Sequence, residues 1–170
     1  KHTLLRDVAY ESLPKRKRRG LHKQIAGWLV ANSRERENES TALIASHLEG
    51  AGEFEKAADY LIKAGDQARA LYAHAEAEHY YRRANELLQS QGRVETVART
   101  LLKLGLVYTA SFDTEKARQA FQEAFDLWQP LKETADFPAI YRKAEVLRMA
   151  AEQPSELEPG EIAADVSTFI

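Results

Sequence analysis

The stretch ARTLLKLGLVYTASFDTEKARQAFQEAFDLWQPL, residues 98–131, decides the fold of this 170-residue chain. Its second half places an aromatic residue between two alanines, Ala117, Phe121 and Ala124, at spacings of four and three. Residues spaced in this way share one helix face, and the small alanines let a neighbouring helix approach closely. Its first half is apolar at helical spacing and includes Gly105. The stretch therefore predicts two packed helices.

The same pattern occurs twice upstream. The triplets Ala57, Leu61, Ala64 and Ala77, Tyr81, Ala84 precede the one above by 60 and 40 residues. A repeat at a fixed period is typical of helical arrays. Because two of the triplets are 20 residues apart, the helix near 53–71 should pack against both of its neighbours. We expect helices over 3–12, 15–31, 41–50, 53–71, 74–89, 93–110, 113–128 and 137–151.

These residues resemble the tetratricopeptide (TPR) family, whose 34-residue unit is a pair of antiparallel helices. In unit 98–131 the family positions hold Leu101, Leu104, Gly105, Tyr108, Ala117, Phe121 and Ala124, and Leu101 stands where the family has Trp. Unit 58–91 matches in register, although Ala68 replaces the usual Tyr. The resemblance implies an all-α, right-handed superhelical array of antiparallel helix hairpins.

Composition agrees with a helical protein. Gly and Pro are few, whereas the strong helix formers recur throughout. The chain has no Cys, which excludes disulfides and thiolate metal sites and is compatible with a cytoplasmic location. No apolar run approaches the roughly 20 residues that span a bilayer. Because the chain begins without Met, we expect it to be a fragment of a longer polypeptide.

Charged residues are distributed unevenly along the chain. Residues 1–36 carry ten Lys or Arg against three Asp or Glu, whereas the remainder carries fourteen against twenty-three. The polar stretch 32–40 reads as a connecting loop, and two prolines follow Gln153. We therefore expect a basic helical segment at 1–36, a repeat array at 41–152, and a linker or the start of another domain at 153–170.

Two further resemblances concern the ends. Residues 2–29, followed by ALIASHLEGAGEFEKAADYLIKAGDQA, resemble the helical arm after the ATPase module of bacterial multidomain signalling ATPases, of the adenylate-cyclase-associated or transcriptional-regulator type. The chain has no phosphate-binding loop of the form GxxxxGK[ST], so ATP binding is not expected here. The tail is similar to the mature start of family 5 extracytoplasmic solute-binding proteins, but Glu158 stands where that family has Asp.

Stacked repeats form an extended inner face suited to a peptide or partner helix. The TPR resemblance maps this groove to Asp59, Ile62, Asp66 and Arg69 in one unit and to Arg99, Leu102, Leu106 and Thr109 in the next. Relatives that bind a chaperone's carboxyl terminus use Lys and Asn there, which argues against that ligand. Each groove residue has an alternative role in the core or on a solvated surface.

Other chemistry has little support. The cations Lys15, Arg16, Lys17, Arg18 and Arg19 could contact an anion, but no aromatic residues alternate with them for base stacking, so nucleic acid is the less favoured partner. His74 and His79 lie near Glu76 and Glu78 but do not form the HExxH motif. We expect no metal site, no cofactor, no catalytic site and no membrane insertion.

The sequence thus predicts a non-catalytic protein-interaction and regulatory arm of a larger bacterial signalling protein. Its partner in the concave groove would be a protein or peptide, the parent chain's own ATPase domain being one candidate. Two alternatives stay open: a transcriptional-regulator module that meets nucleic acid through the basic segment, and a structural spacer without a partner.

Overall fold

The computed structural model describes residues 8, 10–32 and 37–128. Its helices are α2 (Lys15–Asn32), α3 (Glu37–Ala51), α4 (Phe54–Ala70), α5 (His74–Ser90), α6 (Val94–Ala110) and α7 (Thr114–Trp128). No strand occurs in these ranges. None of these helices is both long and apolar enough to cross a membrane.

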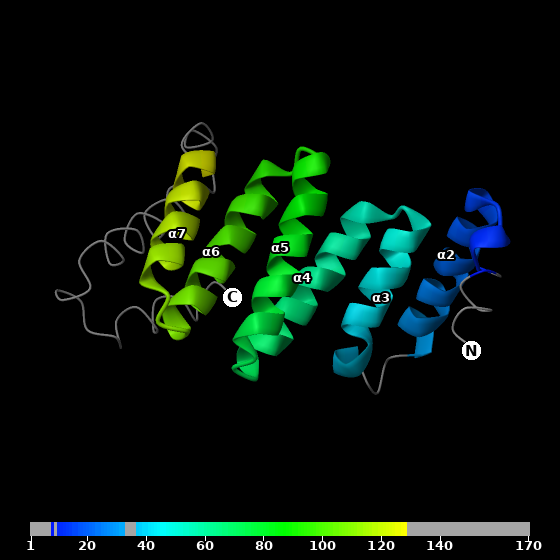
Figure 1. The fold of residues 1–170 in the computed structure, drawn as a ribbon, viewed down its shortest axis with the longest axis horizontal. Coiled ribbons are helices and arrows are strands. Elements are labelled where there is room, and N and C mark those ends of the chain that lie inside the picture. The colour runs from blue at the N-terminus through cyan, green and yellow to red at the C-terminus, as the bar shows by residue number, and fades with distance from the viewer. Residues whose placement is uncertain (1–7, 9, 33–36, 129–170) are drawn as a thin grey trace.

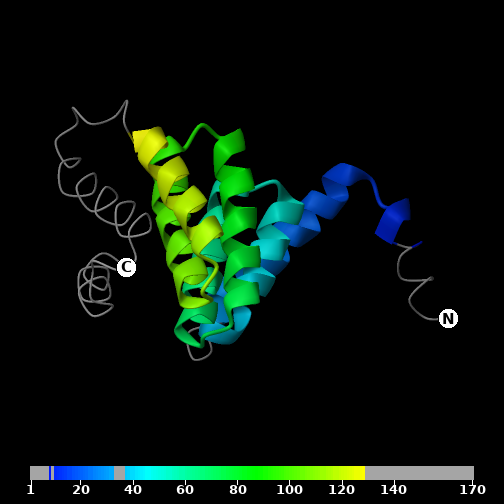
Figure 2. The same ribbon diagram turned by 60° about the vertical axis from the view of Figure 1, so that its left-hand side comes forward.

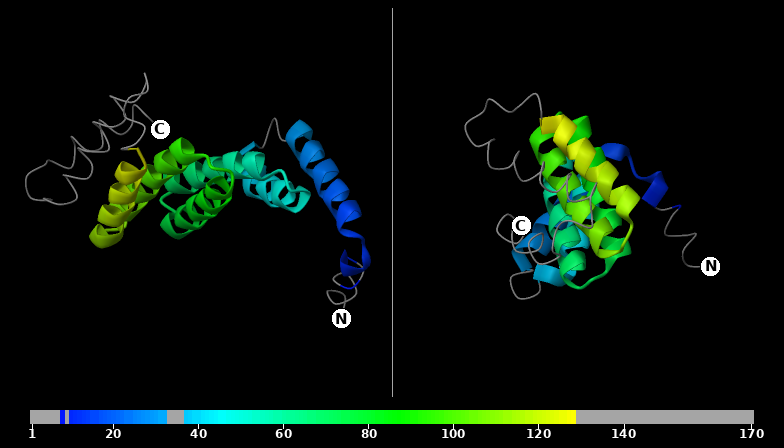
Figure 3. Two further views of the ribbon diagram at one scale, coloured as in Figure 1. Left: turned by 90° about the horizontal axis from the view of Figure 1, so that it is seen from above. Right: turned by 90° about the vertical axis from the view of Figure 1, so that its left-hand side faces the viewer.

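The helices form a single row in chain order (Figure 1). Each packs against the next, so that α3, α4, α5 and α6 each have a neighbour on two sides. The connecting turns alternate between the two edges of the row, which makes consecutive helices antiparallel (Figure 1). The other views show α2 at one end, inclined away from the rest (Figures 2 and 3). The predicted all-α array of antiparallel helices is confirmed.

The core follows the repeat pattern. Ala57, Leu61, Ala64, Ala77, Tyr81, Ala84, Ala117, Phe121 and Ala124 are all buried, none of them more than 5% exposed. Their shared spacing puts small residues where helices cross and a large residue between them. One continuous apolar cluster therefore runs from Ala26 in α2 to Ala124 in α7.

Glycines inside helices mark the closest approaches. A Cβ atom on Gly65 would lie 2.5 Å from Cε1 of the Tyr81 ring, and one on Gly105 would overlap the Phe121 ring. His22 of α2 covers Gly50 of α3 in the same manner. A helical glycine costs about 1 kcal/mol relative to alanine, and here that cost is offset by the packing of a ring directly on the backbone.

The turns between helices alternate in type. Gly52 and Gly92, in the α3–α4 and α5–α6 turns, have positive φ angles of 81° and 68°. Tyr72 and Phe112, in the α4–α5 and α6–α7 turns, have φ angles of 57° and 60°. Their side chains are 80% and 90% exposed. One edge of the row therefore has glycine turns and the other has aromatic turns.

Two glycine substitutions should act in opposite directions. We expect Gly92→Ala to lower the free energy of unfolding by about 1 kcal/mol, because the side chain is forced into the left-handed region. Gly20→Ala should raise it by about 0.5–1 kcal/mol, because Gly20 is helical and the new methyl group would have no other atom within 4 Å. Urea unfolding measures both. Equal effects of the two changes would contradict the assigned backbone conformations.

The observed boundaries correct one prediction. The polar composition of 32–40 predicts a loop, but α3 begins at Glu37. Carboxylates favour the first turn of a helix, where they face the positive end of its dipole, so a polar segment can be helical. The predicted helices between residues 53 and 128 are confirmed to within one residue at each end. The predicted helix 137–151, the tail 153–170 and most of the predicted helix 3–12 lie outside the described residues.

Candidate functional site

The eight residues predicted to line the groove divide between two helices. Asp59, Ile62, Asp66 and Arg69 lie on α4, and Arg99, Leu102, Leu106 and Thr109 lie on α6. The two helices are not consecutive, but an ion pair joins them, because Lys103 Nζ lies 2.7 Å from Asp66 Oδ2. This contact brings the two sets of predicted residues together on one face, which we call the α4–α6 face.

Asp66 is the centre of a polar cluster on this face. Its carboxylate accepts hydrogen bonds from Tyr81 Oη at 2.6 Å and from Lys103 Nζ at 2.8 and 2.7 Å. Burial raises the pKa of Tyr81, and the hydrogen bond to Asp66 raises it further. Arg69 lies beside the Tyr81 hydroxyl and opposes that increase. Asp66 therefore joins three helices, a role that its assignment to the groove did not include.

The apolar members are half-buried. Ile62, Leu102 and Leu106 pack against the core from the α4–α6 face and remain partly exposed. The polar members differ from one another. Asp59 is exposed, Arg99 binds Glu95 one turn away at 2.7 Å, and the Thr109 hydroxyl donates to the Gly105 carbonyl oxygen.

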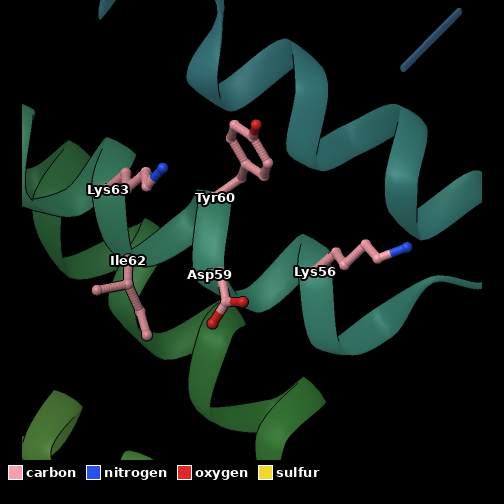
Figure 4. Close-up of a pocket in the computed structure, with 5 residues that line it drawn as sticks. All are labelled: Lys56, Asp59, Tyr60, Ile62 and Lys63. Atoms are coloured by element: carbon pink, nitrogen blue, oxygen red, sulfur yellow. The ribbon is translucent and has the colours of Figure 1, made fainter. Parts of the chain in front are cut away.

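A shallow hollow adjoins the α4–α6 face. It is lined by Lys56, Asp59, Tyr60, Ile62 and Lys63, all from α4. Figure 4 shows Tyr60 and Lys63 directed to one side of α4 and Asp59 and Ile62 directed to the other. The Lys63 ammonium group lies 4.9 Å from the centre of the Tyr60 ring. The residues that line the hollow are thus aromatic, aliphatic and charged.

The repeat units 58–91 and 98–131 differ at two positions whose residue types change together. Tyr81 and Asp66 in the first unit correspond to Phe121 and Leu106 in the second, 40 residues later. Both rings cover a glycine, but only the tyrosine has a hydroxyl, and only its unit has a carboxylate to accept the hydrogen bond. A buried hydroxyl needs a partner, so the two positions change together.

A second polar cluster joins α5 to α6. The Tyr108 hydroxyl donates to Glu78 Oε1 at 3.0 Å and accepts from Arg82 Nη2 at 2.9 Å. Burial is the main cause that raises the pKa of Tyr108. Ala68, the counterpart of Tyr108 in the preceding unit, has no polar side chain. This cluster reinforces the contact between the two units.

The predicted anion contact lies in the first turns of α2. Lys15, Arg16, Lys17 and Arg19 make no ion pair with any other described residue. Arg18 differs, because its guanidinium group binds Glu11 at 3.3 Å and lies over the Tyr10 ring. Lys15, Arg16, Lys17 and Arg19 are exposed, and the Arg19 guanidinium group lies beside Gly52 in the α3–α4 turn.

The histidines do not form a metal centre in the described part of the chain. No three His, Asp or Glu side chains gather there in a way that could hold a metal ion. His74 packs edge-on against Tyr72, and His79 packs against Tyr80. The close histidine pair is a different one, because His22 Nδ1 and His47 Nδ1 lie 3.0 Å apart between α2 and α3.

This histidine pair predicts a pH response. Burial lowers the pKa of His47 from its usual 6.5, and His22 lowers it further. The unfolded chain then binds the proton more tightly than the folded chain. The stabilising contribution is complete above about pH 6.5 and is lost as the pH falls below that value. We expect lower urea midpoints at about pH 5.5 than at about pH 7.5, with a smaller difference in His47→Gln.

The exposed His79 provides the control for this response. The His79→Gln variant should keep the pH dependence of the parent chain. If His47→Gln and His79→Gln had the same effect, the assignment to the α2–α3 junction would be wrong.

Comparison with known proteins identifies the family. Residues 33–156 match the family model of SNAP, the soluble NSF attachment protein. The chain belongs to the SNAP family. A SNAP array is a TPR-like helical repeat, which agrees with the architecture above and confirms the coarser part of the TPR resemblance. SNAP proteins are adaptors that bind protein partners and are generally non-catalytic.

A curated relative extends this comparison. The chain is 26% identical over 149 residues to an uncharacterized protein of Rhizobium meliloti (strain 1021). The alignment covers 83% of this chain and 14% of that protein. The SNAP-like array thus corresponds to a small part of a much longer relative.

Proposed function

We propose that this chain is a protein-interaction arm of a larger bacterial signalling protein in the cytoplasm, and that it binds a peptide or partner domain on the α4–α6 face. Membership of a family of protein-binding adaptors supports the first part. The similarity to a short part of a long bacterial protein is compatible with an arm attached to other domains. The proposed parent protein carries an ATPase module, as the resemblance of residues 2–29 implies.

The observation that carries the proposal is the composition of the α4–α6 face. Ile62, Leu102 and Leu106 leave apolar area partly exposed beside the core. Asp59 and Arg99 occupy equivalent places 40 residues apart and carry opposite charges. A ligand with apolar side chains, a cation toward Asp59 and a carboxylate toward Arg99 would match this pattern.

The existing contacts of Asp66 and Arg99 determine which of the two side chains can bind a charged group of the ligand. Asp66 is already bound by Lys103 and Tyr81, so it orients the face and is a poor anchor for a new charge. Among the described residues, the ion pair that holds Arg99 is an exposed one with Glu95, and such pairs contribute little to stability. Arg99 can therefore exchange its partner for a ligand carboxylate at low cost.

The test is affinity capture from cell extract with three forms of the chain. The Asp59→Lys/Arg99→Glu variant reverses both exposed charges of the α4–α6 face, and Glu123→Lys changes an exposed charge on α7. We expect proteins that bind the parent chain and Glu123→Lys but not the double variant. Purified, those proteins should bind the double variant at least about tenfold more weakly. Equal capture by all three forms would assign the interaction to another surface.

A further inference from the structure

Aromatic rings pack on helical glycines at three junctions of the described row. At the α4–α5 and α6–α7 junctions the rings belong to Tyr81 and Phe121. At the α2–α3 junction the ring belongs to His22, and a Cβ atom on Gly50 would lie 2.6 Å from its Nδ1 atom. Histidine is the residue of these three whose charge changes between about pH 5 and pH 8. The α2–α3 junction therefore has a titratable ring where the other two have a neutral one.

A second histidine faces this ring. His22 Nδ1 lies 3.0 Å from Nδ1 of His47 on α3, and His22 Nε2 lies 2.8 Å from the Tyr10 hydroxyl. Two neutral imidazoles can form this contact, because one Nδ1 atom donates and the other accepts. One added proton preserves the contact, since a protonated His22 donates to both His47 and Tyr10. A second proton breaks it, because both Nδ1 atoms then carry hydrogen and both rings carry a positive charge.

The carboxylates beside this junction are already bound to cations. The ion pairs join Glu11 to Arg18, Glu49 to Arg83 of α5, and Glu53 of the α3–α4 turn to both Lys23 of α2 and Lys56 of α4. Helix α2 itself contains no carboxylate, and its Arg19 makes no ion pair with a described residue. A second imidazolium therefore has positive neighbours on α2 and no free carboxylate to neutralise it among these groups.

The ion pairs around the histidines do not titrate in the same pH range. Hydrogen bonds from Lys23 and Lys56 lower the pKa of Glu53 to about 2, so this carboxylate stays charged while the histidines titrate. Burial lowers the pKa of His47 from its usual 6.5, and the charge of His22 lowers it further. Between about pH 5 and pH 7 the histidine pair is therefore the part of the junction that changes charge.

Few other contacts hold α2 in place. Ala26 is the fully buried residue of α2, and Leu29 packs against the core but remains partly exposed. The Lys23 side chain in the ion pair with Glu53 is 68% exposed, and such pairs contribute little to stability. The other helices are joined by the continuous apolar cluster, which contains no histidine. Loss of the histidine contact should therefore affect α2 far more than the rest of the array.

We propose that the α2–α3 junction is a pH-dependent hinge: when His22 and His47 are both protonated, α2 separates from α3 while α3 to α7 stay folded. The repulsion of two like charges at hydrogen-bond distance drives the separation. The described residues before α2, including Tyr10, move with it. The hinge thus changes their position relative to the α4–α6 face, and it involves none of the residues assigned to that face.

Fluorescence energy transfer between two labels tests the hinge. The chain has no Cys, so cysteines introduced at exposed positions can be labelled selectively. Gln24→Cys/Glu123→Cys reports the position of α2 relative to α7, and Glu86→Cys/Glu123→Cys reports α5 relative to α7. Between about pH 7.5 and about pH 5 we expect the transfer efficiency of the α2–α7 pair to change, with a midpoint below pH 6.5. The transfer efficiency of the α5–α7 pair should stay constant.

Three substitutions assign the response to the histidine pair. His47→Gln keeps a hydrogen-bonding side chain that does not titrate, so it should abolish the change in the α2–α7 pair. His22→Phe introduces the ring type that covers Gly105, so α2 should stay in place at both pH values. His79→Gln changes an exposed histidine of α5 and should leave the response as it is in the parent chain.

Hydrogen exchange of the backbone amides gives an independent measurement. An 18-residue helix without tertiary contacts is only marginally stable in water, so a separated α2 should lose protection. After correction for the effect of pH on intrinsic exchange, the amides of α2 should exchange at least about tenfold faster at about pH 5 than at about pH 7.5. The amides of α5 and α6 should keep their protection.

Three results would overturn the proposal. Constant transfer in the α2–α7 pair would show that α2 does not move with pH. A matching change in the α5–α7 pair, or loss of protection in α5 and α6, would show that the array unfolds as a whole. An equal response in His47→Gln and in the parent chain would assign the change to other titrating groups.

Discussion

Replacing Gly105 with alanine is expected to lower the free energy of unfolding by about 2–3 kcal/mol. The added Cβ would overlap the Phe121 ring. Phe121 is 2% exposed and lies in the core, so the ring has no free space to enter. The helices must then separate, which opens gaps around them. Urea unfolding of the purified chain measures the effect.

A second substitution tests this explanation. Phe121→Leu shortens the group that meets the new methyl, so the cost of Gly105→Ala/Phe121→Leu should be smaller than the sum of the two single costs. Additive costs would show that Gly105 is not required for the ring contact.

Replacing Asp66 with leucine is expected to cost about 2 kcal/mol, although Leu106 occupies the equivalent place one unit later. The change leaves the buried Tyr81 hydroxyl and the partly buried Lys103 ammonium group without their acceptor. An unsatisfied buried polar group is more costly than an apolar pair of the same shape. The free energy of unfolding reports this difference.

The second unit shows which further substitutions should restore the stability lost in Asp66→Leu. Asp66→Leu/Tyr81→Phe reproduces the Leu106 and Phe121 pair, and adding Lys103→Met removes the remaining unpaired charge. We expect the triple variant to recover most of the lost stability, because apolar replacement of a complete polar cluster is often neutral. No recovery would mean that the cluster also determines how α4 and α6 are positioned.

The fold could be predicted from the sequence because the sizes of the side chains follow the repeat. Alanines and one large residue at spacings of four and three mark the buried face directly, and all nine triplet residues are in the core. Gly65 and Gly105 lie where the rings of Tyr81 and Phe121 pack directly on the helix backbone. Helix α3 begins earlier than the sequence predicts because polarity alone does not distinguish a loop from the first turn of a helix. Glutamate is itself a good helix former, so Glu37 is compatible with the observed start of α3.

The candidate site was less predictable because polar contacts connect residues far apart in sequence. Lys103 and Asp66 are in contact although they are 37 residues apart in the sequence, and no local sequence pattern predicts such a contact. The coupled change of Tyr81 and Asp66 to Phe121 and Leu106 was a usable signal, since comparing the two units exposes it. The assignment of groove residues stays a prediction that the charge-reversal experiment addresses.

The alternating turns limit how an array like this one can grow. Gly52, Tyr72, Gly92 and Phe112 follow one another at 20-residue intervals, and the two kinds of turn lie at opposite edges. Duplication of one helix would reverse the direction of everything after it and move aromatic turns to the glycine edge. Duplication of a helix pair would preserve both edges. Natural variants of the array should therefore differ in length by even numbers of helices.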